Sequence, residues 1–178
     1  MTGMIAFPRT LATLVLFMAL PAFAHEGPAP NRVDISPLLL TSGQPTKAFL
    51  ETLKSQGFEA VVYLAPPTVE DALAEEPKIV GAQGIVFVNI PIAWEKPTAA
   101  DFQSFTRVMT ALAGRKVYVH CQMNLRASSM VFLHRVITLK EPPGKAWADV
   151  QRAWVPNATW KAYILATLKA NGVAYEPL

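Results

Sequence analysis

The chain has one cysteine, Cys121, and its neighbours make it the residue best suited to nucleophilic chemistry. Cys121 follows an apolar run that ends at His120, and four residues separate it from Arg126. The thiolate is the reactive form of cysteine, and a nearby guanidinium or helix N-terminus lowers the thiol pKa from about 8.5 to about 3.5–7.5. The pattern therefore predicts a nucleophilic thiolate beside an anion-binding pocket.

The residues after Cys121 are expected to form a loop that binds an anion between a strand and a helix. Backbone N–H groups in such a loop, and at the start of the helix, attract negative charge. The planar guanidinium of Arg126 suits a tetrahedral oxyanion. The other residues expected to surround the bound anion are Gln122, Met123, Asn124, Leu125, Ala127 and Ser128.

Three residues of this segment have two possible roles each. Ser128 either donates a hydrogen bond to the thiolate or is a small polar residue in the first helical turn. His120 either orients the loop through a backbone hydrogen bond or is an ordinary strand-end histidine. Asn124 suits a left-handed position that holds the loop conformation, because asparagine tolerates such backbone angles.

The elements around the loop are expected to alternate between strands and helices, which predicts an α/β fold. Its mostly parallel central sheet of about four to five strands would be flanked by helices. Ligands bind outside the carboxyl ends of such strands, where His120 and Cys121 are expected to lie. Apolar runs predict strands at 38–41, 60–64, 85–90 and 117–120. Helices are expected at 45–55, within 67–83, from 98 to 113, and at 126–140, 145–153 and 157–170.

The first 24 residues have the pattern of a secretory signal peptide. Arg9 precedes an apolar run at 11–20, and Ala22-Phe23-Ala24 closes the segment. Cleavage is expected after Ala24, and the mature protein would be periplasmic or secreted; the alternative is an uncleaved anchor. The run is short for a membrane span, so no stable membrane insertion is expected after cleavage. Residues 25–34 are interpreted as a flexible lead-in and residues 35–178 as a single domain.

The composition indicates which kinds of binding partner are not expected. The net charge is only +3 and no basic stripe stands out, so nucleic-acid binding is not expected. No metal-ligand spacing is visible, and neither a metal nor a cofactor is predicted. A single cysteine in an exported protein is either a small buried hydrophobe or a reactive thiol. The sequence leaves the oligomeric state open.

Residues 120–128 resemble the signature of cysteine-dependent protein phosphatases, especially the bacterial dual-specificity-like branch. That signature is His-Cys, five residues, Arg, and then Ser or Thr. Residues 35–46, 57–64 and 89–98 are similar to further segments of this branch, so the resemblance covers most of the mature chain. It implies a phosphatase-like fold and hydrolysis of phosphate monoesters, such as phosphotyrosine or phosphoserine, through a thiophosphate on Cys121. The partner would be a phosphate-bearing small molecule or a phosphoprotein.

The segment departs from that signature in its spacing. The loop is one residue shorter, so Ala127 stands at the family's arginine position, and the usual loop glycine is absent. These departures favour, as an alternative, a catalytically inactive phosphate-binding pseudophosphatase. The four-residue spacing also resembles that of rhodanese-like sulfurtransferases.

The resemblance also implies a general acid from the loop after residue 89. In this chain Glu95 is the expected acid, where the family has an aspartate. Asp101 is the runner-up, and its alternative role is to cap the helix that begins near Thr98.

Overall fold

The computed structural model describes residues 29–176, so the predicted signal peptide lies outside the described residues. The strands are β1 (Val33–Ser36), β2 (Leu39–Ser42), β3 (Ala60–Tyr63), β4 (Val86–Asn89) and β5 (Val117–His120). The helices are α1 (Lys47–Glu51), α2 (Glu76–Ala82), α3 (Ala99–Ala111), α4 (Leu125–Ile137), α5 (Pro143–Ala153) and α6 (Ala158–Ala170). None of these helices is long and apolar enough to cross a membrane.

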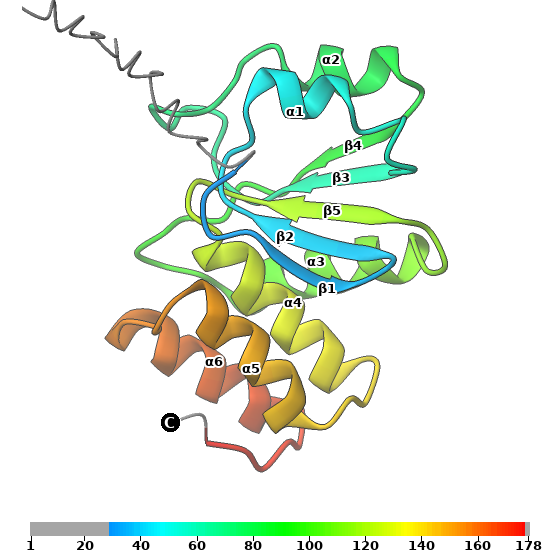
Figure 1. The fold of residues 1–178 in the computed structure, drawn as a ribbon. Coiled ribbons are helices and arrows are strands. Elements are labelled where there is room, and N and C mark those ends of the chain that lie inside the picture. The colour runs from blue at the N-terminus through cyan, green and yellow to red at the C-terminus, as the bar shows by residue number, and fades with distance from the viewer. Residues whose placement is uncertain (1–28, 177–178) are drawn as a thin grey trace, which may run out of the picture.

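The strands form one five-stranded sheet in the order β1-β2-β5-β3-β4. The pairs β2–β5, β5–β3 and β3–β4 are parallel, and β1 joins the edge antiparallel to β2. Figure 1 shows α1 and α2 on one side of this sheet and the remaining helices on the other. The predicted α/β fold with a mostly parallel sheet flanked by helices is therefore confirmed.

The start of the domain differs from the expectation of a flexible lead-in at residues 25–34. Strand β1 begins at Val33, which is buried, and Pro30 accepts a hydrogen bond of 2.7 Å from Gly43. Four residues of alternating apolar and polar character are too few to mark a strand without knowledge of the partner strand. The edge strand was therefore missed, and the domain begins earlier than residue 35.

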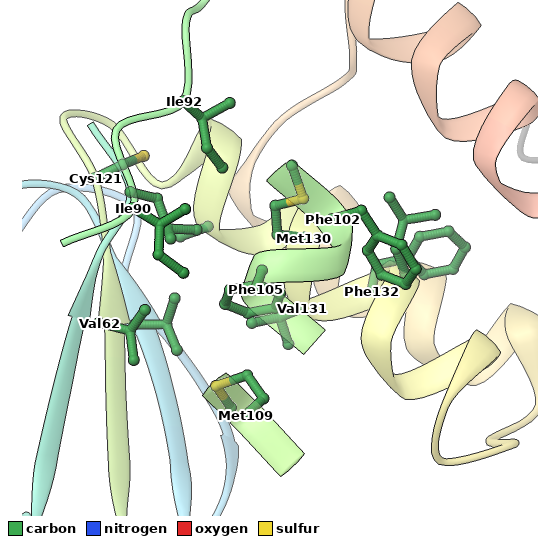
Figure 2. Close-up of a cluster of buried hydrophobic side chains, with 14 of the residues drawn as sticks. Val62, Ile90, Ile92, Phe102, Phe105, Met109, Cys121, Met130, Val131 and Phe132 are labelled. Atoms are coloured by element: carbon green, nitrogen blue, oxygen red, sulfur yellow. The ribbon is translucent and has the colours of Figure 1, made fainter. Parts of the chain in front are cut away.

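The continuous apolar runs of the central strands are explained by two hydrophobic cores, one on each face of the sheet. On β3, Val61 packs into the core under α1 and α2, with Leu50 and Tyr118. The next residue, Val62, packs into the larger core under α3 and α4. Figure 2 shows part of the larger core, where Val62 and Cys121 face side chains from α3 and α4.

The helix that follows the Cys121 loop lies at the centre of the larger core. Every residue of α4 after Leu125 is buried, because α3, α5 and α6 all pack against this helix. A rigid, fully covered helix holds its first turn in a fixed place. The side chain of Arg126, in that turn, is therefore well positioned.

Candidate active site

Cys121 lies immediately beyond the carboxyl end of β5, as the sequence predicts. Its N–H group donates to the carbonyl of Ser42, at the end of the neighbouring strand β2, with a distance of 3.3 Å. The residue is fully buried, with 0% of its surface exposed, and belongs to the same hydrophobic cluster as Ile90 and Ile92. Figure 2 shows Cys121 at the top of this cluster, close to both isoleucines. The thiol is thus held at a strand end beneath the chain that follows β4.

The loop is tied to the domain through its carbonyl groups. Gln122 accepts a hydrogen bond of 2.9 Å from the N–H of Gln44, and Met123 accepts one of 2.9 Å from the side chain of Asn31. Within the described part of the chain, several N–H groups of the loop and of the first turn of α4 donate to no protein acceptor. They belong to Gln122, Met123, Leu125, Arg126 and Ala127. This set of free donors is what an anion-binding loop requires.

Asn124 occupies the left-handed conformation that the sequence analysis anticipated, with φ of 67°. Its side-chain nitrogen donates to the carbonyl of Asn31 at 2.6 Å and to the hydroxyl of Thr41 at 3.1 Å. Asparagine therefore supplies the backbone freedom usually given by glycine, and adds two hydrogen bonds that anchor the loop.

A close backbone contact supports the loop from below. A Cβ atom added to Gly43 would lie 2.6 Å from the carbonyl oxygen of Gln122 and 3.1 Å from the Cα of Met123. Glycine at position 43 is therefore required for the β2 end to approach the loop.

Arg126 is almost fully buried, and its guanidinium is oriented by three contacts. Its Nε donates to the carbonyl of Ile92 at 3.0 Å, and one terminal nitrogen donates to the side-chain oxygen of Gln122 at 3.2 Å. The guanidinium carbon also lies 5.2 Å from the ring centroid of Trp94, a cation–π distance. Arg126 thereby faces a pocket of about 370 Å³, which is lined by Val69, Trp94, Gln122, Met123, Leu125 and Arg126.

The residue before Cys121, His120, forms a buried pair with Glu76. The ring Nε2 of His120 is 2.6 Å from a carboxylate oxygen of Glu76, and both side chains are inaccessible to solvent. The second carboxylate oxygen of Glu76 accepts a hydrogen bond of 3.1 Å from Gln44. The His120 ring also stacks on Tyr63 and Tyr118, at centroid distances of 4.8 and 5.1 Å. Side-chain contacts therefore fix the orientation of the histidine that precedes Cys121.

The two stacking tyrosines are held in their neutral form. Burial is the main cause that raises the pKa of Tyr63 and of Tyr118 above the ordinary value, and the negative charge of Glu76 raises both further. Neither phenol therefore supplies a negative charge beside the loop at neutral pH.

Comparison with known proteins places this site in a family. Residues 24–155 match the family model described as "PTP-NADK: DSP-PTPase phosphatase fused to NAD+ Kinase". The chain belongs to this phosphatase family. The match favours phosphatase ancestry over the rhodanese-like alternative.

This phosphatase-family chain is also similar to individual known proteins. The chain is 30% identical, over 166 residues, to a "Beta-lactamase hydrolase-like protein" of Agrobacterium fabrum, with 79% of this chain and 38% of the relative covered. The chain thus spans well under half of that relative's length. A solved structure named "Putative phosphatase (DUF442)", from Shewanella putrefaciens CN-32, is 28% identical, with a TM-score of 0.72 over 81% of this chain and 95% of that chain.

A more distant structure shares the fold alone. It is the core catalytic domain of the PP-IP phosphatase SIW14 from S. cerevisiae, solved in complex with citrate, which is 13% identical. The TM-score is 0.65, with 78% of this chain and 85% of that chain covered. The two proteins therefore share the arrangement of sheet and helices although few of their residues are identical.

In this phosphatase-family chain, neither carboxylate expected as the general acid forms a hydrogen bond with the Cys121 loop within the described residues. Glu95 is exposed and makes no hydrogen bond or ion pair within the described residues. Asp101 accepts a hydrogen bond of 2.7 Å from the N–H of Thr98 and forms a capping box at the start of α3. The carboxylate of Asp101 is therefore engaged in holding a helix end.

Ser128 also makes local contacts. Its hydroxyl donates to the carbonyl of Asn124 at 2.7 Å and to that of Leu125 at 3.3 Å. In this arrangement the hydroxyl hydrogen is directed at the helix backbone and not at the sulfur.

Within residues 29–176, no cluster of His, Cys, Asp and Glu is suited to hold a metal ion.

Sequence reasoning missed several residues that shape the site. The sequence analysis assigned no role to Glu76, and Asn31 fell in the predicted lead-in. Trp94 and Asp71 also gave no signal, because their importance depends on contacts with Arg126 and Gln122. Only the tertiary fold brings these residues to the loop.

Proposed function

We propose that the chain is an exported cysteine-dependent phosphatase that hydrolyses phosphate monoesters. The observation that carries the proposal is the group of free backbone N–H donors beside Cys121, together with the guanidinium of Arg126. Such an arrangement fits the equatorial oxygens of a phosphoryl group, whose charge must be stabilised in the transition state. Membership of a phosphatase family supports the same reaction.

In this mechanism the Cys121 thiolate attacks phosphorus, and the ester P–O bond breaks. The phosphoryl group is then carried on the sulfur as a thiophosphate, and the first product leaves. Water attacks the phosphorus, the P–S bond breaks, and inorganic phosphate is released. Arg126 and the loop amides bind the phosphoryl oxygens through both steps.

The burial of Cys121 adds a condition to this mechanism. Ile92 belongs to the buried cluster around the cysteine, and its carbonyl accepts a hydrogen bond from Arg126. A phosphoryl group reaches the fully buried sulfur only when side chains around Cys121 move. Binding of substrate is therefore coupled to a local rearrangement around the cysteine.

The pocket in front of Arg126 indicates the kind of ester that fits. Its walls include the side chains of Val69, Trp94, Met123 and Leu125, which offer mostly apolar surface around a cationic base. An apolar or aromatic leaving group suits these walls better than a small polar one. The proposed substrates are accordingly aryl phosphates, including phosphotyrosine, before phosphoserine.

The direct test is hydrolysis of an aryl phosphate by purified protein that starts at residue 25. The Cys121→Ser variant is the matched control, because serine keeps the shape of the side chain but is a far weaker nucleophile here. The proposal predicts turnover by the unchanged protein and its loss in the variant. Equal rates in the two proteins would contradict it.

The full burial of Cys121 favours a second candidate function, that of a phosphate-binding protein without turnover. The N–H donors would still bind an anion in that case, while the sulfur would stay covered. Calorimetry with phosphate or vanadate would then show binding, and no aryl phosphate would be hydrolysed. Turnover that depends on Cys121 would eliminate this candidate.

Export is proposed from the N-terminal pattern of the sequence. The supporting features are Arg9, the apolar run at 11–20 and the Ala22-Phe23-Ala24 ending. Expression of the full chain followed by cell fractionation and N-terminal sequencing tests this point. A mature protein that starts at His25 outside the cytoplasm is expected, and an uncleaved cytoplasmic protein would contradict export.

A further inference from the structure

Cleavage of a phosphate ester requires a proton for the leaving oxygen, and the structure offers one carboxylate attached to the Cys121 loop. The side chain of Asp71, in the segment between β3 and α2, accepts a hydrogen bond of 2.9 Å from the side-chain nitrogen of Gln122. Gln122 is the residue directly after Cys121. We infer that Asp71 is the general acid of the proposed reaction, an inference that rests on the proposed phosphatase function.

The contacts of Gln122 connect Asp71 to the anion-binding group. The amide nitrogen of Gln122 donates to one carboxylate oxygen of Asp71, and its amide oxygen accepts from Arg126 at 3.2 Å. One planar side chain therefore spans the distance between the carboxylate and the guanidinium. The other oxygen of Asp71 has no hydrogen-bond partner within residues 29–176, so it remains available to carry a proton.

A close neighbour of Asp71 in the sequence lines the pocket in front of Arg126. Val69, two positions earlier, lines the 370 Å³ pocket together with Gln122 and Arg126. The segment is folded into turns by a hydrogen bond of 3.0 Å from Ala72 to the carbonyl of Val69. Asp71 is exposed.

The electrostatics of Tyr63 agree with this placement. Burial contributes most to its raised pKa, and the negative charges of Asp71, Glu76 and Cys121 raise it further. Asp71 and Cys121 therefore both lie near the same phenol. The raised pKa of Tyr63 therefore agrees with a position of Asp71 close to Cys121.

Within the described residues, Glu76, Asp101 and Glu95 accept no hydrogen bond from the Cys121 loop. Both oxygens of Glu76 are hydrogen-bonded in a buried position, to His120 and Gln44. Asp101 caps α3. Glu95 makes no contact that ties it to the loop within the described residues, whereas Asp71 does.

The proton balance of the inferred step is complete. When the S–P bond forms and the ester P–O bond breaks, the leaving oxygen takes the electron pair of that bond and the proton of the Asp71 carboxyl. In the second step the Asp71 carboxylate takes a proton from the attacking water as its oxygen bonds to phosphorus. The P–S electron pair returns to Cys121 as thiolate, and Asp71 is protonated again.

The test compares two substrates that differ in their need for an acid. Phenyl phosphate has a poor leaving group, whereas the phenolate of p-nitrophenyl phosphate departs without protonation. Asp71→Asn is expected to lower kcat for phenyl phosphate by about 10²-fold or more, the usual contribution of a general acid. The loss for p-nitrophenyl phosphate should be much smaller, and the basic limb of the kcat–pH profile should disappear. The neighbouring exposed Glu70→Gln is the matched control and should leave both rates unchanged.

The results of this test distinguish failure of the Asp71 inference from failure of the proposed phosphatase function. An equal loss for both substrates with an unchanged pH profile would overturn the inference, as would no loss at all or a leaving-group-dependent loss in Glu95→Gln instead. In each of these cases Cys121-dependent turnover persists, so the proposed function stands. A wild-type protein without Cys121-dependent turnover would overturn both. Equal thermal unfolding of Asp71→Asn and the wild type will show that the variant is folded.

Discussion

Asn124 and Asn31 lie 93 positions apart in the sequence, and a hydrogen bond of 2.6 Å joins the side chain of the first to the carbonyl of the second. A return contact of 2.9 Å runs from the Asn31 side chain to the carbonyl of Met123. The residues before β1 therefore help to hold the Cys121 loop in shape. Asn124, whose backbone is left-handed, is the loop residue whose side chain bonds to the segment before β1.

Replacement of Asn124 separates backbone strain from side-chain bonding. Alanine at φ of 67° incurs a strain of about 1–2 kcal/mol, whereas glycine does not. Both variants lose the side-chain hydrogen bonds. Asn124→Ala should therefore lower the free energy of unfolding by about 1 kcal/mol more than Asn124→Gly, as measured by urea titration. An alanine variant as stable as the glycine variant would show that the loop is not strained there.

The buried pair of Glu76 and His120 predicts a strong difference between two substitutions. Glu76→Ala leaves His120 without its partner and should cost about 1–3 kcal/mol of unfolding free energy, the usual cost of a buried polar group left without a hydrogen bond. Glu76→Gln keeps an acceptor for His120. Its amide nitrogen also gains a partner if the Gln44 amide rotates, because the Gln44 side-chain oxygen is buried without one. The glutamine variant should lose far less stability, and equal losses in urea unfolding would contradict this account.

Stability should fall on the acidic side of neutrality because of His134. Burial lowers the pKa of this residue below its ordinary value, and its ring accepts or donates a hydrogen bond of 2.6 Å with Thr106. A lowered folded-state pKa means that the unfolded chain binds the proton more readily. The contribution is therefore complete above about pH 6.5 and is lost as pH falls toward the folded-state value.

The comparison of thermal unfolding at about pH 7.5 and about pH 5.5 measures this effect. His134→Asn keeps a polar group near Thr106 but does not titrate in this range, so its melting temperature should fall less between the two conditions. An identical fall in both proteins would assign the pH dependence to other groups.

Arg126 should contribute most of the side-chain affinity for phosphate. A charge-assisted hydrogen bond contributes about 1.5–3 kcal/mol, so Arg126→Lys or Arg126→Met should weaken phosphate or vanadate binding by about 10- to 100-fold in calorimetry. Lysine keeps the charge but not the planar fork, and should restore only part of the loss. Unchanged affinity in Arg126→Met would place the anion elsewhere.

Local patterns in the sequence predicted the elements that carry the site. The apolar run at 117–120 became β5, Thr98 and Asp101 form the capping box that was anticipated, and Asn124 has left-handed angles. These features depend on neighbouring residues, so the chain itself contains the information.

The residues that surround the loop were beyond the reach of such reasoning. Glu76 lies 44 positions from His120, and Asp71 lies 51 positions from Gln122. Glu76 and Asp71 both occur in a stretch rich in acidic residues, where a solvated side chain is the usual outcome. Which carboxylate is buried, and which reaches the loop, depends on how α2 packs against the sheet.

The most direct test of the account is whether Cys121 carries the phosphoryl group during turnover. Protein that starts at residue 25 would be mixed with p-nitrophenyl phosphate, quenched rapidly in acid and digested, and the peptides analysed by mass spectrometry. The account predicts a phosphorylated peptide that contains Cys121, absent from Cys121→Ser. Turnover of the substrate by the Cys121→Ser variant, or phosphorylation at another residue, would contradict the central claim.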